Sequence, residues 1–283
     1  MKDAENLAAA RLNPRVEDST IFLDRAECAA LGRSLHQAYV TNKPFPHIVI
    51  EDLLPLDLLR QVVEHFPKRE AGRFNDAHSR LKTGYQLDKI RSPLITNLID
   101  ALNSAAFLNF LEEMTGIKGL IPDPYQLGGG LHETARGGHL SIHADFNMHN
   151  QLGLRRRMNL ILFLNEDWHE SYGGALELWE TDMSACAQAV LPLMGRAVVF
   201  NTESDSFHGH PEPLTCPEDR FRRSLALYYY TAPEASHALE ESRTTDFRPR
   251  PGTADAPAAK RLKMKSLMRD LLPPILYRAL KGK

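Results

Sequence analysis

The spacing of apolar residues changes along the chain, from a helical period in the first part to short alternating runs later. Segment 25–40 (RAECAALGRSLHQAYV) and the segment from about Pro55 to Phe66 predict helices, with a short β run in PFPHIVIEDLLP between them. The stretch SPLITNLIDALNSAAFLNFLEEMTG predicts one or two further helices that end at Gly116. Residues 68–92 are rich in charge and have no clean period, which predicts a mobile loop.

From about Tyr125 onward, short β-type runs alternate with glycines and polar residues. Almost no helical pattern lies between these runs, which favours an antiparallel sandwich or jelly roll over a parallel α/β sheet. We therefore expect an α+β protein, in which a β core is packed against helices from the N-terminal half. The predicted strands are Tyr125–Thr134, His139–Asp145, Met158–Asn165, Ala175–Glu180, Arg196–Asn201 and Arg222–Thr231.

The domain organisation predicted from these patterns is one domain with terminal extensions. Residues 1–120 form its mainly helical support region and residues 121–235 its β core. Residues 236–257 read as a linker rich in Pro, Ala and Gly, and residues 258–283 as a basic amphipathic tail. The tail predicts either a helix packed on the protein's own core or a segment that contacts an anionic membrane surface or a partner weakly.

Composition narrows the class of protein. The 283 residues are 43% hydrophobic with a formal charge of -2, as expected for a globular protein with a substantial core. This charge, and the lack of a reading motif in the basic tail, argue against nucleic-acid binding. Cys28, Cys186 and Cys216 are far apart and odd in number, so a disulfide framework is not expected. With a charged N-terminus and no apolar segment of about 18 residues, the chain is expected to be cytoplasmic.

The stretch HLSIHADFN contains the first candidate metal-ligating residues. On a strand, His143 and Asp145 project from the same face, so they present an imidazole and a carboxylate to one point. The best source of a third ligand is FNTESDSFHGHPEP, where His208 and His210 share one strand parity. Two histidines and one carboxylate suit nonheme iron(II) working with oxygen. The same donors can also hold zinc, which predicts a hydrolase instead.

The stretch RRSLALYYYT helps to separate the iron and zinc alternatives. Arg222, Ser224, Ala226 and Tyr228 share one face of the predicted strand, so a guanidinium lies at the end of a row that includes small residues. Such a face leaves room for a small dicarboxylate whose distal end pairs with the arginine. Zinc hydrolysis has no need of this feature. Arg223 is expected to point the opposite way, unless a bulge exchanges the two arginines.

Four motifs occur in a recognisable order: His143-x-Asp145, LNEDWHESYGGALELWE, FHGHPEP and RRSLALYYY. Together they resemble the iron(II)/2-oxoglutarate-dependent oxygenases, and more narrowly their prolyl 4-hydroxylase-like branch. The resemblance covers roughly Tyr125 to Thr231, and PFPHIVIEDLLP is similar to the first strand and helix of bacterial members. It implies a double-stranded β-helix, a jelly-roll variant, which agrees with the strand pattern.

The resemblance implies a ligand set and a reaction. His143, Asp145 and His208 would bind iron(II), and the likeness to the family's F-H-G favours His208 over His210. The reaction implied is hydroxylation of an unactivated C-H bond of a small molecule or a protein or peptide side chain with O2, while 2-oxoglutarate is decarboxylated to succinate and ascorbate acts as a reductant. Alternatives are a noncatalytic sensor of 2-oxoglutarate or metal on the same fold, and a zinc hydrolase.

The resemblance also implies the cosubstrate contacts. Arg222 would pair with the distal carboxylate of 2-oxoglutarate, while Asn159, Ile161 and Phe163 would line its pocket. Several relatives have a tyrosine at the place of Phe163, and phenylalanine has no donor, so another group must complete the carboxylate's hydrogen bonds. The run Arg155-Arg156-Arg157 follows a loop that could cover the substrate. It is expected to be a solvated turn, and attraction of an anionic substrate is the alternative.

Overall fold

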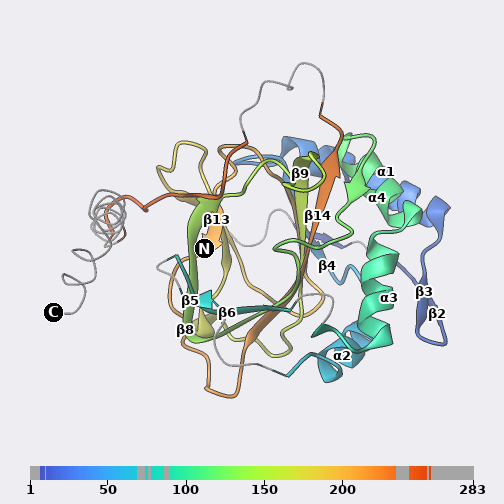
Figure 1. Cartoon of the computed structure of the whole chain (residues 1–283), viewed down its shortest axis with the longest axis horizontal. Helices are drawn as coiled ribbons and strands as arrows, with labels where there is room; N and C mark the ends of the chain where they lie inside the picture. The colour runs from blue at the N-terminus through green and yellow to red at the C-terminus, as the bar shows by residue number, and fades with distance from the viewer. Residues whose placement is uncertain are drawn as a thin grey trace.

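The computed structural model describes residues 7–9, 11–68, 74–75, 78–85, 89–233, 242–253 and 255. A strongly curved sheet forms a barrel-like body, and four helices gather on one side of it (Figure 1). The expected tail, 258–283, lies outside the described residues, as does part of the expected linker. This arrangement confirms the predicted α+β jelly roll with helices packed on its core.

The four helices begin and end where the local sequence favours it. Asp24 caps the first helix by accepting a 2.8 Å hydrogen bond from the backbone N-H of Glu27. The last helix ends at Gly116, whose φ of 77° is the left-handed conformation that glycine adopts without strain. The predicted helices are therefore confirmed. They are α1 (Arg25–Thr41), α2 (Leu56–Glu64), α3 (Pro93–Leu102) and α4 (Ala105–Thr115), with a 3-10 turn η2 at Glu170–Tyr172.

Within the described residues, no single helix has the length and apolarity to cross a membrane. Helices α3 and α4 meet that criterion only when counted together, across a 43° bend.

Most strands belong to one large sheet with the order β1-β4-β12-β9-β14-β8-β13-β10-β11, and neighbours on this path are antiparallel except β1 and β4. The strands on the path are β1 (Leu7–Ala9), β4 (His47–Glu51), β8 (Gly130–Ala144), β9 (Arg155–Phe163), β10 (Leu176–Trp179), β11 (Cys186–Val190), β12 (Ala197–Asn201), β13 (His208–His210) and β14 (Arg222–Thr231). Four short or peripheral strands extend the sheet: β5 (Phe74–Asn75), β6 (Ser79–Tyr85), β7 (Ile121–Pro122) and β15 (Asp246–Phe247). A separate hairpin pairs β2 (Arg15–Glu17) with β3 (Thr20–Phe22).

Alternation along the strands divides the sheet into two faces. On β14, Leu225, Leu227 and Tyr229 join one apolar core with side chains of the four helices. Ser224 and Ala226, which alternate with them, line a cavity on the other face. The helices therefore cover the outside of the barrel and leave its interior for polar chemistry.

Three segments differ from the expected organisation. The two predicted strands flanking Gly137 form one long strand, β8, in which Gly137 has a φ of 75°. The expected mobile loop at 68–92 contains β5 and β6, and β6 pairs with β8 along most of its length. Strand β15 lies inside the expected linker and pairs with the end of β8. The N-terminal support region also contributes β1, β4, β5 and β6 to the sheet, and the domain boundaries remain a prediction.

Candidate metal centre and its cavity

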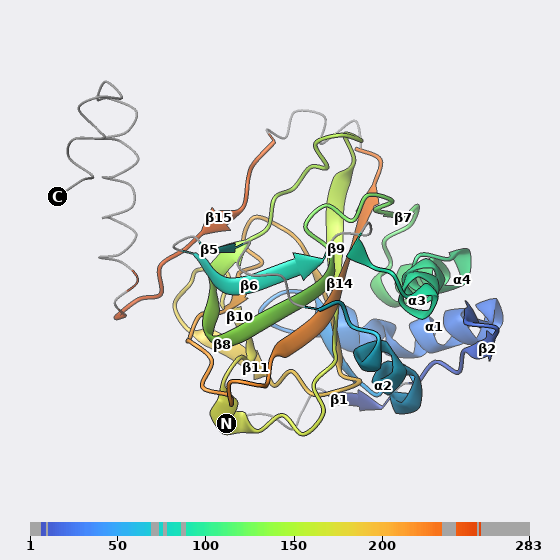
Figure 2. The same cartoon turned by 60° about the horizontal axis from the view of Figure 1, so that its bottom comes forward.

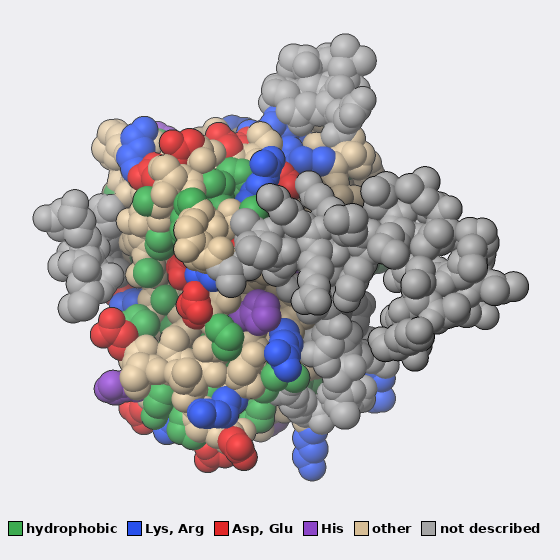
Figure 3. Space-filling model, turned by 90° about the vertical axis from the view of Figure 1, so that its left-hand side faces the viewer, with side chains coloured by type: hydrophobic (Ala, Val, Ile, Leu, Met, Phe, Trp, Pro, Cys, Tyr) green, Lys and Arg blue, Asp and Glu red, His purple; other side chains and the backbone are tan. Residues whose placement is uncertain are grey.

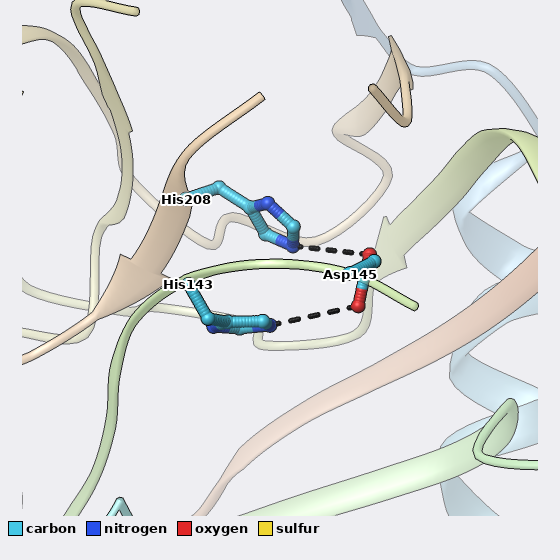
Figure 4. A group of neighbouring side chains, drawn as sticks. All are labelled: His143, Asp145 and His208. Carbon is cyan, nitrogen blue, oxygen red and sulfur yellow. Dashed lines mark ion pairs between the residues drawn. The ribbon is translucent and has the colours of Figure 1, made fainter. Parts of the chain in front are cut away.

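Two neighbouring strands bring the candidate metal ligands together. His208 on β13 pairs directly with His143 on β8, and their ring centroids are 4.5 Å apart. Asp145 follows the end of β8, two residues after His143 and on the same face. One potential ligand atom from each of the three residues lies within 4.8 Å of the other two, as the convergent side chains in Figure 4 show. Residues that are 63 positions apart, Asp145 and His208, thus share one buried point.

The backbone orients both imidazole rings toward this point. Nδ1 of His143 lies 2.8 Å from the carbonyl oxygen of Ser141, and Nδ1 of His208 lies 3.0 Å from that of Ser206. A carbonyl only accepts hydrogen bonds, so Nδ1 must carry the proton in each ring. The Nε2 atoms keep their lone pairs and face Asp145, at 3.7 Å from Oδ1 for His143 and 3.5 Å from Oδ2 for His208. This is the orientation that a metal ligand needs.

The Asp145 carboxylate is held by two donors on β9. Nδ2 of Asn159 donates to Oδ2 at 2.7 Å, and the Arg156 guanidinium approaches the same oxygen at 3.1 Å. Arg156 also donates to Oδ1 of Asn159 from Nε at 3.1 Å and Nη2 at 2.6 Å. The guanidinium and the amide therefore hold each other as well as the carboxylate, which fixes the orientation of Asp145 before any metal binds.

Arg156 corrects the expectation that Arg155-Arg156-Arg157 is a solvated turn. The three residues begin β9, and Arg156 is only 1% exposed. Its guanidinium carbon lies 3.5 Å from the ring centroid of Tyr228 and 4.4 Å from that of Phe146. Stacking on two aromatic faces and pairing with a carboxylate compensate the loss of water around the charge.

The electrostatics of the cluster favour metal binding at neutral pH. Burial, and then the positive field of His208, lower the pKa of His143 to about 3. Burial also lowers the pKa of His208. Burial alone would raise the pKa of Asp145, but Arg156 and then the two histidines hold that pKa below its usual range. At neutral pH the rings are therefore neutral and the carboxylate is ionised, which is the protonation state that binds a cation.

A cavity extends from the three ligands along the inside of the barrel. It includes the predicted residues Asn159, Ile161 and Arg222, together with the face of β14 that was expected to be lined by small side chains. It also includes His210, which lies beside the triad but does not belong to the group whose atoms converge. The full lining is Lys82, His132, Thr134, Leu140, His143, Asp145, Asn159, Ile161, Leu176, His208, His210, Arg222, Ser224, Ala226 and Tyr228.

Arg222 and Arg223 point to opposite faces of β14, as the alternation predicts. Arg223 leaves the cavity and pairs with Glu133 at 2.9 Å. Arg222 is 6% exposed inside the cavity, and its Nε donates to the carbonyl oxygen of Gly174 at 2.6 Å. A Cβ atom on Gly174 would lie 2.9 Å from Cδ of Arg222, so only glycine lets the arginine occupy this position.

Phe163 supports the arginine and does not line the cavity as expected. It is fully buried in an apolar cluster with Leu176, Leu178 and their neighbours, and its ring centroid lies 5.0 Å from the Arg222 guanidinium carbon. The alternation of β9 does place Phe163 on the inner face, but its neighbours Arg222 and Leu176 line the cavity and Phe163 does not.

The interior and the surface differ in charge. On the coloured part of the face in Figure 3, acidic and basic side chains are interspersed with hydrophobic ones. In the cavity, Asp145 is the one acidic residue of the described lining, against two cations and four histidines. Lys82, one of these cations, was missed from the sequence, because β6 was expected to be a loop.

The donor set fits a divalent transition metal. Two imidazole nitrogens and one carboxylate oxygen lie on a single wall of the cavity, which leaves the other side open to exogenous ligands. This two-histidine, one-carboxylate set is typical of nonheme iron(II) sites. Lys82 and Arg222 flank Thr134, nine residues before His143 on β8, and this cationic end of the cavity suits an acidic small molecule.

Comparison with known proteins agrees with this assignment. Residues 129–230 match the family model described as the 2OG-Fe(II) oxygenase superfamily. No curated protein sequence matches the chain at a significant level.

Solved structures are similar to this chain to different degrees. A prolyl hydroxylase from Trichoplax adhaerens, in complex with a hypoxia inducible factor peptide fragment, aligns with a TM-score of 0.51 at 15% identity, over 77% of this chain and 96% of that chain. A Pseudomonas putida prolyl-4-hydroxylase aligns with a TM-score of 0.48 at 18% identity, over 71% and 98%. HygX from Streptomyces hygroscopicus, with nickel, 2-oxoglutarate and hygromycin B bound, gives 0.48 at 12%, over 76% and 97%.

Proposed function

We propose that this protein, whose residues 129–230 match the model of the 2OG-Fe(II) oxygenase superfamily, hydroxylates an unactivated C-H bond of a small molecule or of a protein or peptide side chain. The carrying observation is that one cavity holds both a buried His143-Asp145-His208 cluster and, at its other end, a buried arginine. A zinc hydrolase needs the first feature but not the second.

In this proposal the chain's own residues bind and orient the reactants. His143, Asp145 and His208 hold the iron, and the backbone carbonyls behind the two rings keep Nε2 available for it. When bound, iron(II) would supply the oxidising chemistry that uses O2 and 2-oxoglutarate and yields succinate and CO2.

Arg222 fixes the far end of the cosubstrate. Burial lowers the pKa of Arg222 to about 9, so the guanidinium remains charged at neutral pH. Its Nε is committed to Gly174, which leaves the terminal nitrogens to pair with the distal carboxylate of 2-oxoglutarate. Asn159 and Ile161 line the space between this carboxylate and the metal ligands. A cosubstrate anchored at both ends holds its reacting atoms in one geometry.

The test is succinate formation. The purified protein, supplied with iron(II), 2-oxoglutarate and ascorbate under air, is expected to release succinate slowly alone and faster with its substrate. A substrate screen with this readout identifies the substrate class. Binding of 2-oxoglutarate with no succinate from any substrate pool would support the sensor alternative. Activity without oxygen and with tightly retained zinc would support the hydrolase.

We also propose a cytoplasmic location, supported by the three free cysteines, Cys28, Cys186 and Cys216. Contact of the C-terminal tail with a membrane surface or partner remains a prediction.

A further inference from the structure

Strand β6 places a lysine in the cavity lining, although this strand lies outside residues 129–230, which match the family model. Lys82 on β6 pairs with Thr134 on β8, and Arg222 on β14 pairs with the same Thr134 from the opposite side. Figure 2 shows β8 lying between β6 and β14. Lys82 and Arg222 both line the cavity, so two long cationic side chains from separate strands flank one position of β8.

Neither cation has an acidic partner in the described part of the chain. The cavity's one carboxylate, Asp145, is at the metal end and is already bound by Arg156 and Asn159. Burial, followed by the field of Arg222, lowers the pKa of Lys82 to about 8, while Asp145 acts in the opposite direction. Arg222 is buried and Lys82 is partly buried, and two such cations that repel each other cost free energy until an anion binds between them. The inner end of the cavity is therefore built for an anion.

Arg222 alone leaves some acceptor positions of a bound carboxylate without a hydrogen-bond donor. Phe163 offers no hydrogen-bond donor beneath the arginine, and Nε of Arg222 is committed to Gly174. A carboxylate has about four acceptor positions, and a guanidinium that binds through its two terminal nitrogens fills two of them, so the hydroxyl groups of Thr134 and Ser224 or a second cation must fill the others. An ammonium group brings three further donors and is free to rotate toward either oxygen. Lys82 is the cationic side chain in the described lining that meets this need.

We propose that Lys82 is the second cation of the 2-oxoglutarate subsite, where it pairs with the distal carboxylate together with Arg222. The inference rests on the proposed function, because it names the cosubstrate as the partner of Lys82. It also makes Lys82 a determinant of cosubstrate specificity. The pair selects 2-oxo acids with a second carboxylate over those of equal length without one.

The experiment measures cosubstrate binding without turnover. The full-length protein is loaded with manganese(II), kept free of oxygen and titrated calorimetrically with 2-oxoglutarate. Lys82→Met is expected to weaken binding about 10- to 100-fold, the usual range for loss of a charge-assisted hydrogen bond in a dry site. Lys82→Arg, which keeps the charge, is expected to restore most of the affinity.

Arg80 provides a matched control on the same strand. It is exposed, and Arg80→Met removes the same charge from β6 without touching the cavity. This variant is expected to bind 2-oxoglutarate within about twofold of the unchanged protein, because salt screens an exposed charge outside the cavity. An equal loss in Arg80→Met and Lys82→Met would overturn the proposal, since it would show a general field effect.

Two further readouts separate a ligand contact from a structural role. Without 2-oxoglutarate, Lys82→Met is expected to bind manganese(II) normally and to unfold at the same or a higher temperature, because an uncompensated charge is removed. With 2-oxopentanoate, which lacks the distal carboxylate, Lys82→Met and the unchanged protein are expected to bind equally. A defect confined to metal binding, or one equal for both 2-oxo acids, would overturn the proposal.

The failure of this proposal is distinguishable from that of the proposed function. If the unchanged protein binds 2-oxoglutarate and Lys82→Met binds it equally well, only the role of Lys82 is wrong. If the unchanged protein with manganese(II) binds no 2-oxoglutarate, the proposed function fails and the role of Lys82 fails with it.

Discussion

The two ends of the cavity are prepared for their ligands in opposite ways. At the metal end, the negative charge of Asp145 is already balanced by Arg156, and each donor atom is oriented by a hydrogen bond behind it. At the inner end, Lys82 and Arg222 face each other without an anion in the described lining. The first end is preorganised in geometry, whereas the second stores repulsion that a dicarboxylate relieves. The comparison predicts that changes at the metal end affect metal affinity and changes at the inner end affect cosubstrate affinity.

The largest effect is expected from His143→Ala. This change removes one of three ligands, and metal affinity is expected to fall by more than about a hundredfold, since even groups behind metal ligands contribute about 10- to 100-fold. Succinate formation should be lost while the circular dichroism spectrum and melting curve stay close to those of the unchanged protein. His169→Ala, at an exposed position outside the cavity, is the control. Normal metal content in His143→Ala would remove this residue from the proposed site.

The adjacent arginines of β14 offer the next contrast. Arg222→Met is expected to raise the 2-oxoglutarate concentration needed for half-maximal succinate formation about a hundredfold, because a paired charge and two hydrogen bonds are lost. Arg223→Met breaks the ion pair with Glu133 on the outer face and should lower the melting temperature with little change in this concentration. If the two variants behaved alike, the alternation of β14 would not determine which arginine binds the cosubstrate.

A smaller effect is expected when the support of Asp145 is weakened. Arg156→Met leaves Asn159 as the remaining described donor to the carboxylate, and metal affinity is expected to fall about tenfold. Calorimetric titration with manganese(II) measures this loss. Arg155→Met, which removes a neighbouring cation that pairs with Glu203, should bind the metal normally. Unchanged affinity in Arg156→Met would mean that packing alone orients Asp145.

The smallest effect is a pH dependence of cosubstrate binding. The pKa of Lys82 is about 8 in the folded protein, so its ammonium is charged below that pH and increasingly neutral above it. The field of Arg222 favours the neutral form and that of Asp145 the charged form, while Arg156 adds to the effect of Arg222. Because 2-oxoglutarate pairs with the charged form, its affinity is expected to fall about twofold between about pH 7 and pH 8, below the pH at which Arg222, with a pKa of about 9, is half neutral.

Lys82→Met is the control for this pH dependence, since it should bind weakly but almost equally across the same range. A profile that is identical in the two proteins would assign the titration to another group. The histidines of the inner end are poor candidates, because burial holds the pKa values of His132 and His210 well below their usual range.

Much of the barrel and the metal ligands could be predicted from the sequence because their signals are local. Strands such as β9 and β14 alternate apolar core residues with inward-facing residues, and each keeps one parity through the part that lines the cavity. His143 and Asp145 are two residues apart, and on a strand this spacing places both side chains on the same face. The fold class and the predicted helices are confirmed, and His143, Asp145 and His208 do converge. Their assignment as iron ligands stays a prediction.

The residues that were missed depend on contacts between distant segments. Leu81 has a φ of 52°, and the register of β6 against β8 shifts between Arg80 and Lys82, so no simple alternation marks this strand. Its inward positions are a lysine and a glycine, which give no apolar signal. Arg156 was misjudged for a related reason. Three consecutive arginines are typical of a solvated turn, and only the fold brings the rings of Phe146 and Tyr228 to either side of one of them.

Strand β8 has a further consequence for the choice of cosubstrate. The same strand carries His143 near its end and, before the bend at Gly137, Thr134, the position flanked by both cations. The position flanked by the two cations and the first metal ligand are therefore nine residues apart on one hydrogen-bonded strand. Strand β8 thus limits the length of the acid that fits between the metal ligands and the two cations. Loops at the mouth can change to admit new substrates while the length of acid that fits inside stays the same.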